Sequence, residues 1–161
     1  MSTTTKLLNT IALLCLLAVG IALVSQHVFG MQPCAWCVLQ RLIFLVTAAV
    51  CVLGSLLSRA KAMQKLCALL ALVLCLGGIV AAWYQYNVAQ HMFSCDLTFA
   101  DRFMVQTGLD AHLPWLFGIF ATCMDARVSV LGIEYVLWSM GLFIVLAIMS
   151  LVALWPRVKM A

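Results

Sequence analysis

The sequence has very little charge: Asp, Glu, Lys and Arg make up 9% of its 161 residues, whereas a soluble domain has about 25%. Hydrophobic residues account for 66% of the chain, more than a domain of this size can bury in a soluble core. This composition excludes a disordered chain, and the nine scattered basic residues form no continuous patch for nucleic acid. We therefore predict an integral membrane protein in which residues 1–161 form one compact domain.

Proline is also scarce, and none of the three prolines interrupts a long apolar run. A helix needs about 20 residues to cross a hydrocarbon core about 30 Å thick. Four apolar runs are long enough, and they cover residues 7–25, 38–57, 66–86 and 135–155. Each run should be helical, because lipid offers its backbone polar groups no other partner. The predicted fold class is an all-α four-transmembrane-helix bundle with a long loop between the third and fourth helices.

Acidic residues are missing from most of the sequence, since all five lie within residues 96–134. Basic residues without acidic neighbours occur in three other segments, namely 1–6, 58–65 and 156–161. Because Lys and Arg accumulate in cytoplasmic loops, we expect these segments and both termini to be cytoplasmic. Loops 26–37 and 87–134 would then share the periplasmic side of a bacterial inner membrane. The apolar segment 113–120 is expected to lie along the membrane surface.

The eight cysteines divide into two groups of four. The first group lies within the apolar runs, where a free cysteine usually behaves as a small buried hydrophobe: Cys15, Cys51, Cys67 and Cys75. The second group lies in or beside the predicted periplasmic loops: Cys34, Cys37, Cys95 and Cys123. Disulfides form and persist in the oxidising periplasm, so the second group is the candidate site.

Cys34 and Cys37 form a C-x-x-C motif where a loop meets the start of the second predicted helix. This spacing allows a small, labile disulfide, and a helix N-terminus lowers the pKa of a thiol placed there. Arg41 lies one helical turn after Cys37, where its charge would favour a thiolate or an anionic partner. The alternatives are half of a zinc site, a structural disulfide and, for Arg41, a charge that snorkels to the interface.

Cys95 and Cys123 lie 28 residues apart in the long loop. One interpretation is a structural disulfide that stabilises the loop by about 3–4 kcal/mol on the chain-entropy model. The other is a second exchangeable pair, because thiol–disulfide exchange passes two electrons through mixed disulfides. The spacing leaves both interpretations open. His27, His91 and His112 stand at no interval typical of zinc ligands, so we predict no metal site.

The order of these motifs resembles that of the disulfide bond formation protein B (DsbB) family, bacterial membrane thiol–quinone oxidoreductases. The matching residues are Gln26-His27-Val28, Pro33-Cys34-x-x-Cys37-x-x-x-Arg41, Cys95-Asp96, Cys123, Gly132-Ile133-Glu134 and Trp138. They span nearly the whole chain, and the family also places its C-x-x-C at the start of the second of four helices.

The resemblance implies two redox-active disulfides, Cys34–Cys37 and Cys95–Cys123. The first pair would pass electrons to a membrane quinone, with Cys37 nearest the ring and Arg41 needed for quinone use. Cys95 would form the mixed disulfide with a periplasmic DsbA-like thiol oxidase. Cys123 would then exchange with Cys34 and so connect the two pairs.

The resemblance also implies the partners: a DsbA-like oxidase, the membrane quinone pool and the lipid bilayer, with ubiquinone favoured over menaquinone. Family members carry a histidine near the quinone at the end of the third helix. Here Tyr86 aligns with that histidine, so Tyr86 and the nearby His91 are the candidates for this contact. Gln40 stands where an acid often precedes the arginine. The alternative function is a non-enzymatic four-helix membrane protein whose periplasmic loops are held by structural disulfides.

Overall fold

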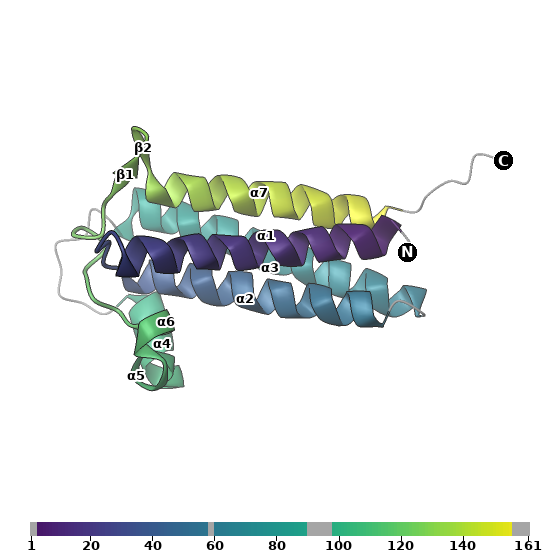
Figure 1. Ribbon diagram of the computed structural model, residues 1–161, viewed down its shortest axis with the longest axis horizontal. Helices are drawn as coiled ribbons and strands as arrows, with labels where there is room; N and C mark the ends of the chain where they lie inside the picture. The colour runs from purple at the N-terminus through teal and green to yellow at the C-terminus, as the bar shows by residue number, and fades with distance from the viewer. Residues whose placement is uncertain (1–2, 58–59, 90–97, 156–161) are drawn as a thin grey trace.

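Four long helices run side by side in the computed structural model, which describes residues 3–57, 60–89 and 98–155 (Figure 1). They are α1 (Thr3–His27), α2 (Ala35–Leu56), α3 (Lys61–Asn87) and α7 (Tyr135–Leu154). Each of the four is long and apolar enough to cross a membrane. The prediction of an all-α protein with four membrane-spanning helices is confirmed.

The helix boundaries differ from those expected from the apolar runs. α1 begins at Thr3 rather than residue 7, and α3 begins at Lys61 rather than residue 66. At their other ends α1 reaches His27 and α3 reaches Asn87, whereas α7 stops at Leu154. Hydropathy marks the part of a helix that lipid can cover. The backbone hydrogen bonds continue into polar residues at either end when nothing breaks them.

The start of α2 is the boundary that matters most for the candidate site. α2 begins at Ala35 rather than residue 38, so Cys37 lies in the first turn of the helix and not in the preceding loop. Cys34 is the N-cap, in an extended conformation with φ −89° and ψ 171°. Pro33 lies just before this N-cap, outside the helix, where its missing N–H removes no helical hydrogen bond.

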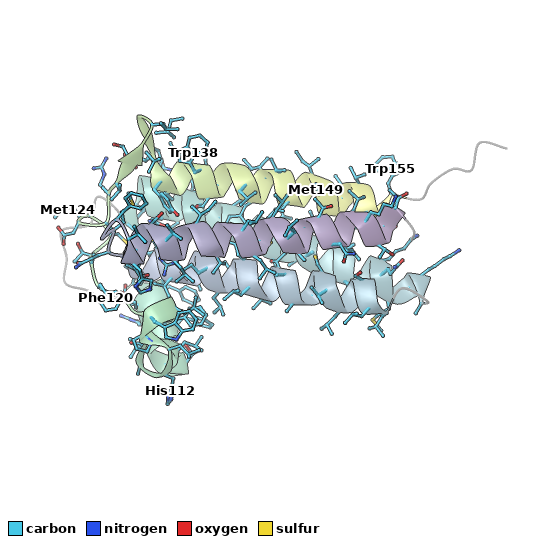
Figure 2. The ribbon with its side chains drawn as sticks, in the orientation of Figure 1. His112, Phe120, Met124, Trp138, Met149 and Trp155 are labelled. Atoms are coloured by element: carbon cyan, nitrogen blue, oxygen red, sulfur yellow. The ribbon has the colours of Figure 1, made fainter. Side chains whose placement is uncertain are left out.

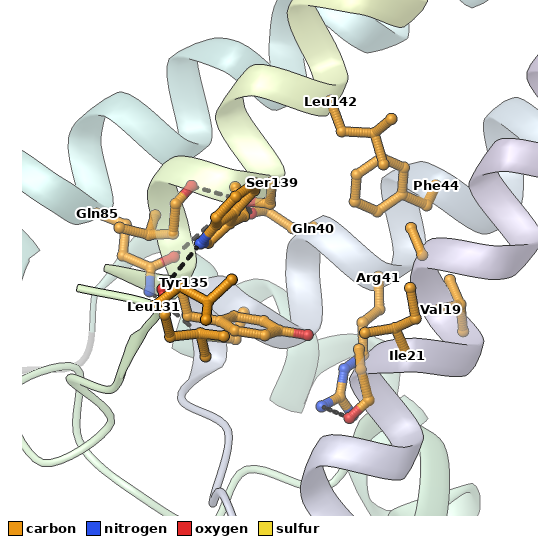
Figure 3. A pocket seen from close by; sticks show the side chains of 16 residues that line it. Val19, Ile21, Gln40, Arg41, Phe44, Gln85, Leu131, Tyr135, Ser139 and Leu142 are labelled. Atoms are coloured by element: carbon orange, nitrogen blue, oxygen red, sulfur yellow. Dashed lines mark hydrogen bonds between the residues drawn. The ribbon is translucent and has the colours of Figure 1, made fainter. Parts of the chain in front are cut away.

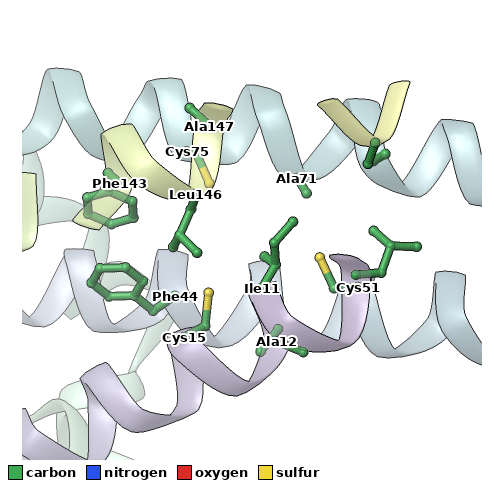
Figure 4. Close-up of a cluster of buried hydrophobic side chains, with 14 of the residues drawn as sticks. Ile11, Ala12, Cys15, Phe44, Cys51, Ala71, Cys75, Phe143, Leu146 and Ala147 are labelled. Carbon is green, nitrogen blue, oxygen red and sulfur yellow. The ribbon is translucent and has the colours of Figure 1, made fainter. Parts of the chain in front are cut away.

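The core of the bundle is built from aliphatic, aromatic and small side chains (Figure 4). Phe44 of α2 stacks on Phe143 of α7 with ring centroids 4.0 Å apart. Three cysteines of the first group, Cys15, Cys51 and Cys75, are fully buried in the same cluster. They fill the space between the helices as small hydrophobes.

Two tryptophans lie towards opposite ends of α7, Trp138 on its first turns and Trp155 just after its last residue (Figure 2). Their side chains are 48% and 71% exposed. Tryptophans are enriched where the hydrocarbon meets the headgroups, because the ring is apolar and its N–H is polar. Their positions fit a helix that crosses the bilayer between them.

The connection between α3 and α7 contains short elements at the end of the bundle where α2 begins (Figure 1). They are α4 (Phe99–Thr107), α5 (Leu109–His112), α6 (Pro114–Phe117), β1 (Ser129–Val130) and β2 (Ile133–Glu134). A capping box between Thr98 and Asp101 starts α4, and Gly108 ends it with φ +66°. The described residues of the predicted loop 87–134 therefore include short helices and a two-stranded hairpin.

Candidate functional site

Cys34 and Cys37 lie together at the start of α2, with their sulfur atoms 3.2 Å apart. A disulfide bond is about 2.05 Å long, so the structure shows the pair as two free thiols. Cys34 is fully buried and Cys37 is half-buried. The two sulfurs are close enough to form a disulfide with little movement of the backbone.

Cys123 is the third thiol at this site. Its partly buried side chain packs against the cluster that contains Cys34, and the two thiols interact. Hydrogen bonding to Cys123 raises the pKa of Cys34 to about 12, helped by burial and opposed by the hydrogen bond to Cys37. Cys34 therefore contacts both Cys37 and Cys123, and it favours the protonated thiol.

The loop that carries Cys123 is tied to the start of α2 by its backbone. The N–H groups of Phe120 and Ala121 both donate to the carbonyl of Pro33, at 3.1 and 3.3 Å. These bonds hold the loop next to the C-x-x-C motif. The other predicted members of the site in this connection, His91 and Cys95, lie outside the described residues.

Arg41 is buried, with 6% of its surface exposed. Its guanidinium donates to Gln26 Oε1 at 2.6 Å and to the Leu116 carbonyl at 3.1 Å. A longer contact of 3.4 Å joins it to the Ala22 carbonyl. All three acceptors are neutral, so within the described part of the chain no carboxylate neutralises this charge. Arg41 is therefore held inside the protein and does not extend to the lipid interface.

A cavity of about 450 Å³ lies between α1, α2, α3, α7 and the β1–β2 hairpin (Figure 3). Its walls are largely apolar, and Cys37 and Arg41 both line it. Tyr135 lines the cavity as well, with its ring between Gln85 and Arg41 in Figure 3. A volume of this size is typical of sites that hold a small organic ligand. Cys37 therefore connects the thiol cluster to a cavity that such a ligand can fill.

The sequence did not indicate three polar side chains at the cavity as site residues. Gln85 donates to Cys37 Sγ at 3.2 Å, and Gln40 donates to the Oε1 of Gln85 at 2.7 Å. The Ser139 hydroxyl donates to Gln40 in turn. Gln40 and Gln85 could have been recognised from the sequence, because glutamines within apolar helices are costly in lipid and usually functional. Among the described residues that line the cavity, Gln85 is the one from α3. The predicted residue Tyr86, next to it in the sequence, is half-buried and does not line the cavity.

The fold and the site together define a class: a multi-pass membrane protein with a cysteine cluster beside a cavity at one end of its helix bundle. A family model described as "Disulfide bond formation protein DsbB" matches residues 4–153. The chain belongs to this family, as the order of its motifs predicted. It is accordingly an oxidoreductase of disulfide bond formation.

Similar proteins cover almost the full chain. A "Disulfide bond formation protein B" from Herminiimonas arsenicoxydans is 30% identical over 152 residues, which are 94% of this chain and 95% of the relative. One from Ralstonia nicotianae is 32% identical over 140 residues, 86% of each chain. "Disulfide bond formation protein B 2" of Pseudomonas aeruginosa is 33% identical over 133 residues, 80% of this chain and 78% of the relative.

Proposed function

We propose that this protein oxidises a periplasmic DsbA-like thiol oxidase and passes the electrons to a membrane quinone, for which ubiquinone is favoured. Two redox-active cysteine pairs carry the electrons, Cys95–Cys123 and Cys34–Cys37. One observation carries the proposal: Cys34 contacts Cys123, while its neighbour Cys37 faces the apolar cavity. The C-x-x-C pair thus stands between a loop thiol and a ligand site.

The cavity fits a quinone. The largely apolar walls suit the ring and the start of an isoprenoid tail, and Phe44 and Leu142 are among the lining residues. Arg41 offers an uncompensated positive charge to an electron-rich ring oxygen. When bound, a quinone would supply the acceptor for two electrons and two protons. Arg41 and Tyr135 would hold its polar edge, and Cys37 would face it.

The order of exchange follows from which thiols are in contact. The Cys123 thiolate, formed when the DsbA-like partner has reduced the outer pair, attacks the Cys34 sulfur of the Cys34–Cys37 disulfide. The Cys34–Cys123 bond forms, the Cys34–Cys37 bond breaks, and Cys37 leaves as a thiolate next to the cavity. Cys95 then attacks Cys123, which restores the outer disulfide and releases Cys34. Two electrons have moved to the inner pair, and Arg41 stabilises the negative charge near Cys37.

The orientation proposed for the chain agrees with the positions of its described lysines. Lys6 lies at the start of α1, and Lys61 and Lys65 lie at the start of α3. This end of the bundle is opposite to the end at which α2 begins with Cys34 (Figure 1). With the lysines in the cytoplasm, the thiol site faces the periplasm.

Quinone reduction by the purified protein tests the proposed function. Ultraviolet absorbance is followed with a soluble ubiquinone and a reduced DsbA-like protein, for wild type, Cys37→Ser and Cys67→Ser. We expect wild-type turnover in Cys67→Ser, whose cysteine lies in α3 outside the site, and none in Cys37→Ser. Equal turnover in Cys37→Ser, or none in folded wild type with any quinone, would contradict the proposal and favour the structural alternative.

A further inference from the structure

Gln85 of α3 donates hydrogen bonds to both cysteines of the C-x-x-C motif, which lies at the start of α2. Its Nε2 donates to Cys37 Sγ at 3.2 Å and to Cys34 Sγ at 3.6 Å. The side chain is only 3% exposed, on the last turns of α3. Within the described chain, Gln85 is the one side chain outside the motif with a hydrogen bond to Cys37. The guanidinium of Arg41 bonds to oxygen atoms instead.

The orientation of the Gln85 amide is fixed by its other partner. Gln40 Nε2 donates to Gln85 Oε1 at 2.7 Å, so the N–H₂ end of Gln85 has to face the sulfurs. Gln40 is oriented in turn, because its Oε1 accepts from the Ser139 hydroxyl, which also lies 2.9 Å from the Val136 carbonyl. The three residues come from α3, α2 and α7 and form one directed chain (Figure 3). Turning the Gln85 amide round would set its one oxygen against the lone pairs of both sulfurs, and its N–H₂ group against that of Gln40.

We infer that Gln85, held by Gln40 and Ser139, is a positioning residue that stabilises the thiolate of the C-x-x-C pair by donating an N–H to sulfur. A hydrogen bond to a charged acceptor is about twice as strong as one between neutral groups. Gln85 is itself buried, so it donates this hydrogen bond from a fixed position inside the bundle. The role of Gln85 rests on the redox function proposed above for Cys34 and Cys37.

Loss of the Gln85 N–H should lower the reactivity of the cysteine pair and its reduction potential. Without the Gln85 N–H the thiolate is less stable, so the pair reacts more slowly with an alkylating reagent at a given pH. The midpoint of the alkylation profile moves to higher pH. Because the reduced form of the pair loses stabilisation, its reduction potential becomes more negative. Loss of one charge-assisted hydrogen bond corresponds to a change of about tenfold in rate or equilibrium constant.

α3 supplies a matched control. Gln64 is on the same helix, is 4% exposed, and donates to Thr5 Oγ1 at 2.9 Å, far from the thiols at the other end of the bundle. Gln64→Leu removes a buried amide just as Gln85→Leu does. It therefore carries a similar folding cost without touching Cys34 or Cys37.

The test uses the full chain in detergent, reduced and without added quinone or protein partner. Iodoacetamide labelling of Cys34 and Cys37 is followed by peptide mass spectrometry across a pH series. Equilibration with glutathione buffers gives the potential of the pair. The variants are Gln85→Leu, Gln85→Glu, Ser139→Ala and Gln64→Leu. Gln85→Glu keeps the size of the side chain, but its carboxylate accepts hydrogen bonds and donates none when ionised.

We expect slower labelling, about tenfold in Gln85→Leu and at least as much in Gln85→Glu, with wild-type labelling in Gln64→Leu. Ser139→Ala should shift labelling in the same direction by less, because it only frees Gln40 to turn. The inference is overturned if folded Gln85→Glu and Ser139→Ala keep the wild-type labelling profile and the wild-type reduction potential. This holds even if Gln85→Leu fails to fold. Shifted profiles in a protein that never reduces quinone would support the role of Gln85 and refute the proposed function separately.

Discussion

The sulfur atoms of Cys34 and Cys37 lie 3.2 Å apart, yet the two residues face different surroundings. Cys34 is fully buried against the loop thiol Cys123, whereas Cys37 lines the cavity that Arg41 also lines. The N-cap residue and the third residue of a helix lie on the same face, so the difference comes from what packs beside each sulfur: the loop with Cys123 at Cys34 and the cavity at Cys37. In the proposed function, this pair receives electrons from Cys123 on one side and releases them towards the cavity on the other.

Cys37→Ser should trap the Cys34–Cys123 disulfide. In this variant the Cys34 thiolate can attack Cys123 of the Cys95–Cys123 disulfide, so the Cys34–Cys123 bond forms and Cys95 leaves as a thiolate. No Cys37 thiol is present to attack Cys34 and form the inner disulfide. We expect peptide mass spectrometry without reductant to find Cys34 linked to Cys123 in the oxidised variant before any dithiol is added. Cys67→Ser serves as the control and should show no such link at steady state. If Cys34 of the Cys37→Ser protein stays a free thiol, the contact with Cys123 is not the route of exchange.

Much of this site could be predicted because its chemistry is encoded locally. The C-x-x-C spacing and Arg41 one turn later act within a single helix, so the sequence alone indicates that they cooperate. The roles of Gln85 and Tyr135 depend on how α3 and α7 pack against α2, and no spacing within the chain encodes that packing. The resemblance predicts Tyr86 as a neighbour of the ligand, whereas the adjacent Gln85 lines the cavity.

In the fold, too, features encoded locally in the sequence could be predicted and the others could not. Apolar runs predict the four membrane helices well, since lipid exposure is a property of each run. The short helix α4 was missed, although the spacing Thr98-x-x-Asp101 is a capping-box signal. It stands in a segment without a long apolar run, where hydropathy carries little information. Helix ends were misplaced for a related reason, because hydropathy does not report backbone hydrogen bonds.

Two neighbouring glycines on α3 should respond differently to alanine. A Cβ on Gly78 would lie 2.4 Å from the ring of Phe143, whereas a Cβ on Gly77 meets nothing within 4 Å. Gly78→Ala should therefore destabilise the bundle by about 1–3 kcal/mol through overpacking. Gly77→Ala should be neutral or stabilise it by up to about 1 kcal/mol through helix propensity. Thermal unfolding in detergent compares them, and equal midpoints for the two variants would show that this packing is not as described.

The alkylation of Cys34 should depend on pH in a way set by Cys123. Because hydrogen bonding to Cys123 and burial raise the pKa of Cys34 to about 12, the residue remains a neutral thiol at physiological pH. Labelling of the reduced protein should be slow at neutral pH and accelerate only in strongly alkaline buffer. Cys123→Ala removes the largest cause, so the labelling profile of Cys34 should move to lower pH. A wild-type profile centred near the ordinary thiol value, or one unchanged in Cys123→Ala, would contradict this account.

Substitutions of Arg41 should separate its charge from its hydrogen bonds. Arg41→Ala removes both, so we expect half-maximal turnover to need about tenfold more quinone, the change expected for one charge-assisted hydrogen bond. It should also lower the unfolding temperature, because the side chain ties α2 to Gln26 and to the Leu116 carbonyl. Arg41→Lys keeps a charge but not the planar fork that reaches several acceptors at once, and should fall between alanine and wild type.

Gln26→Ala is the control for these Arg41 variants, because it removes one acceptor and leaves the guanidinium in place. It should lower stability with a smaller effect on the quinone requirement. Quinone titrations and thermal unfolding of all three variants make the comparison. If Gln26→Ala raised the quinone requirement as much as Arg41→Ala, the guanidinium would act through the packing of α1 against α2. If only Arg41→Ala did so, its charge would act on the cavity directly.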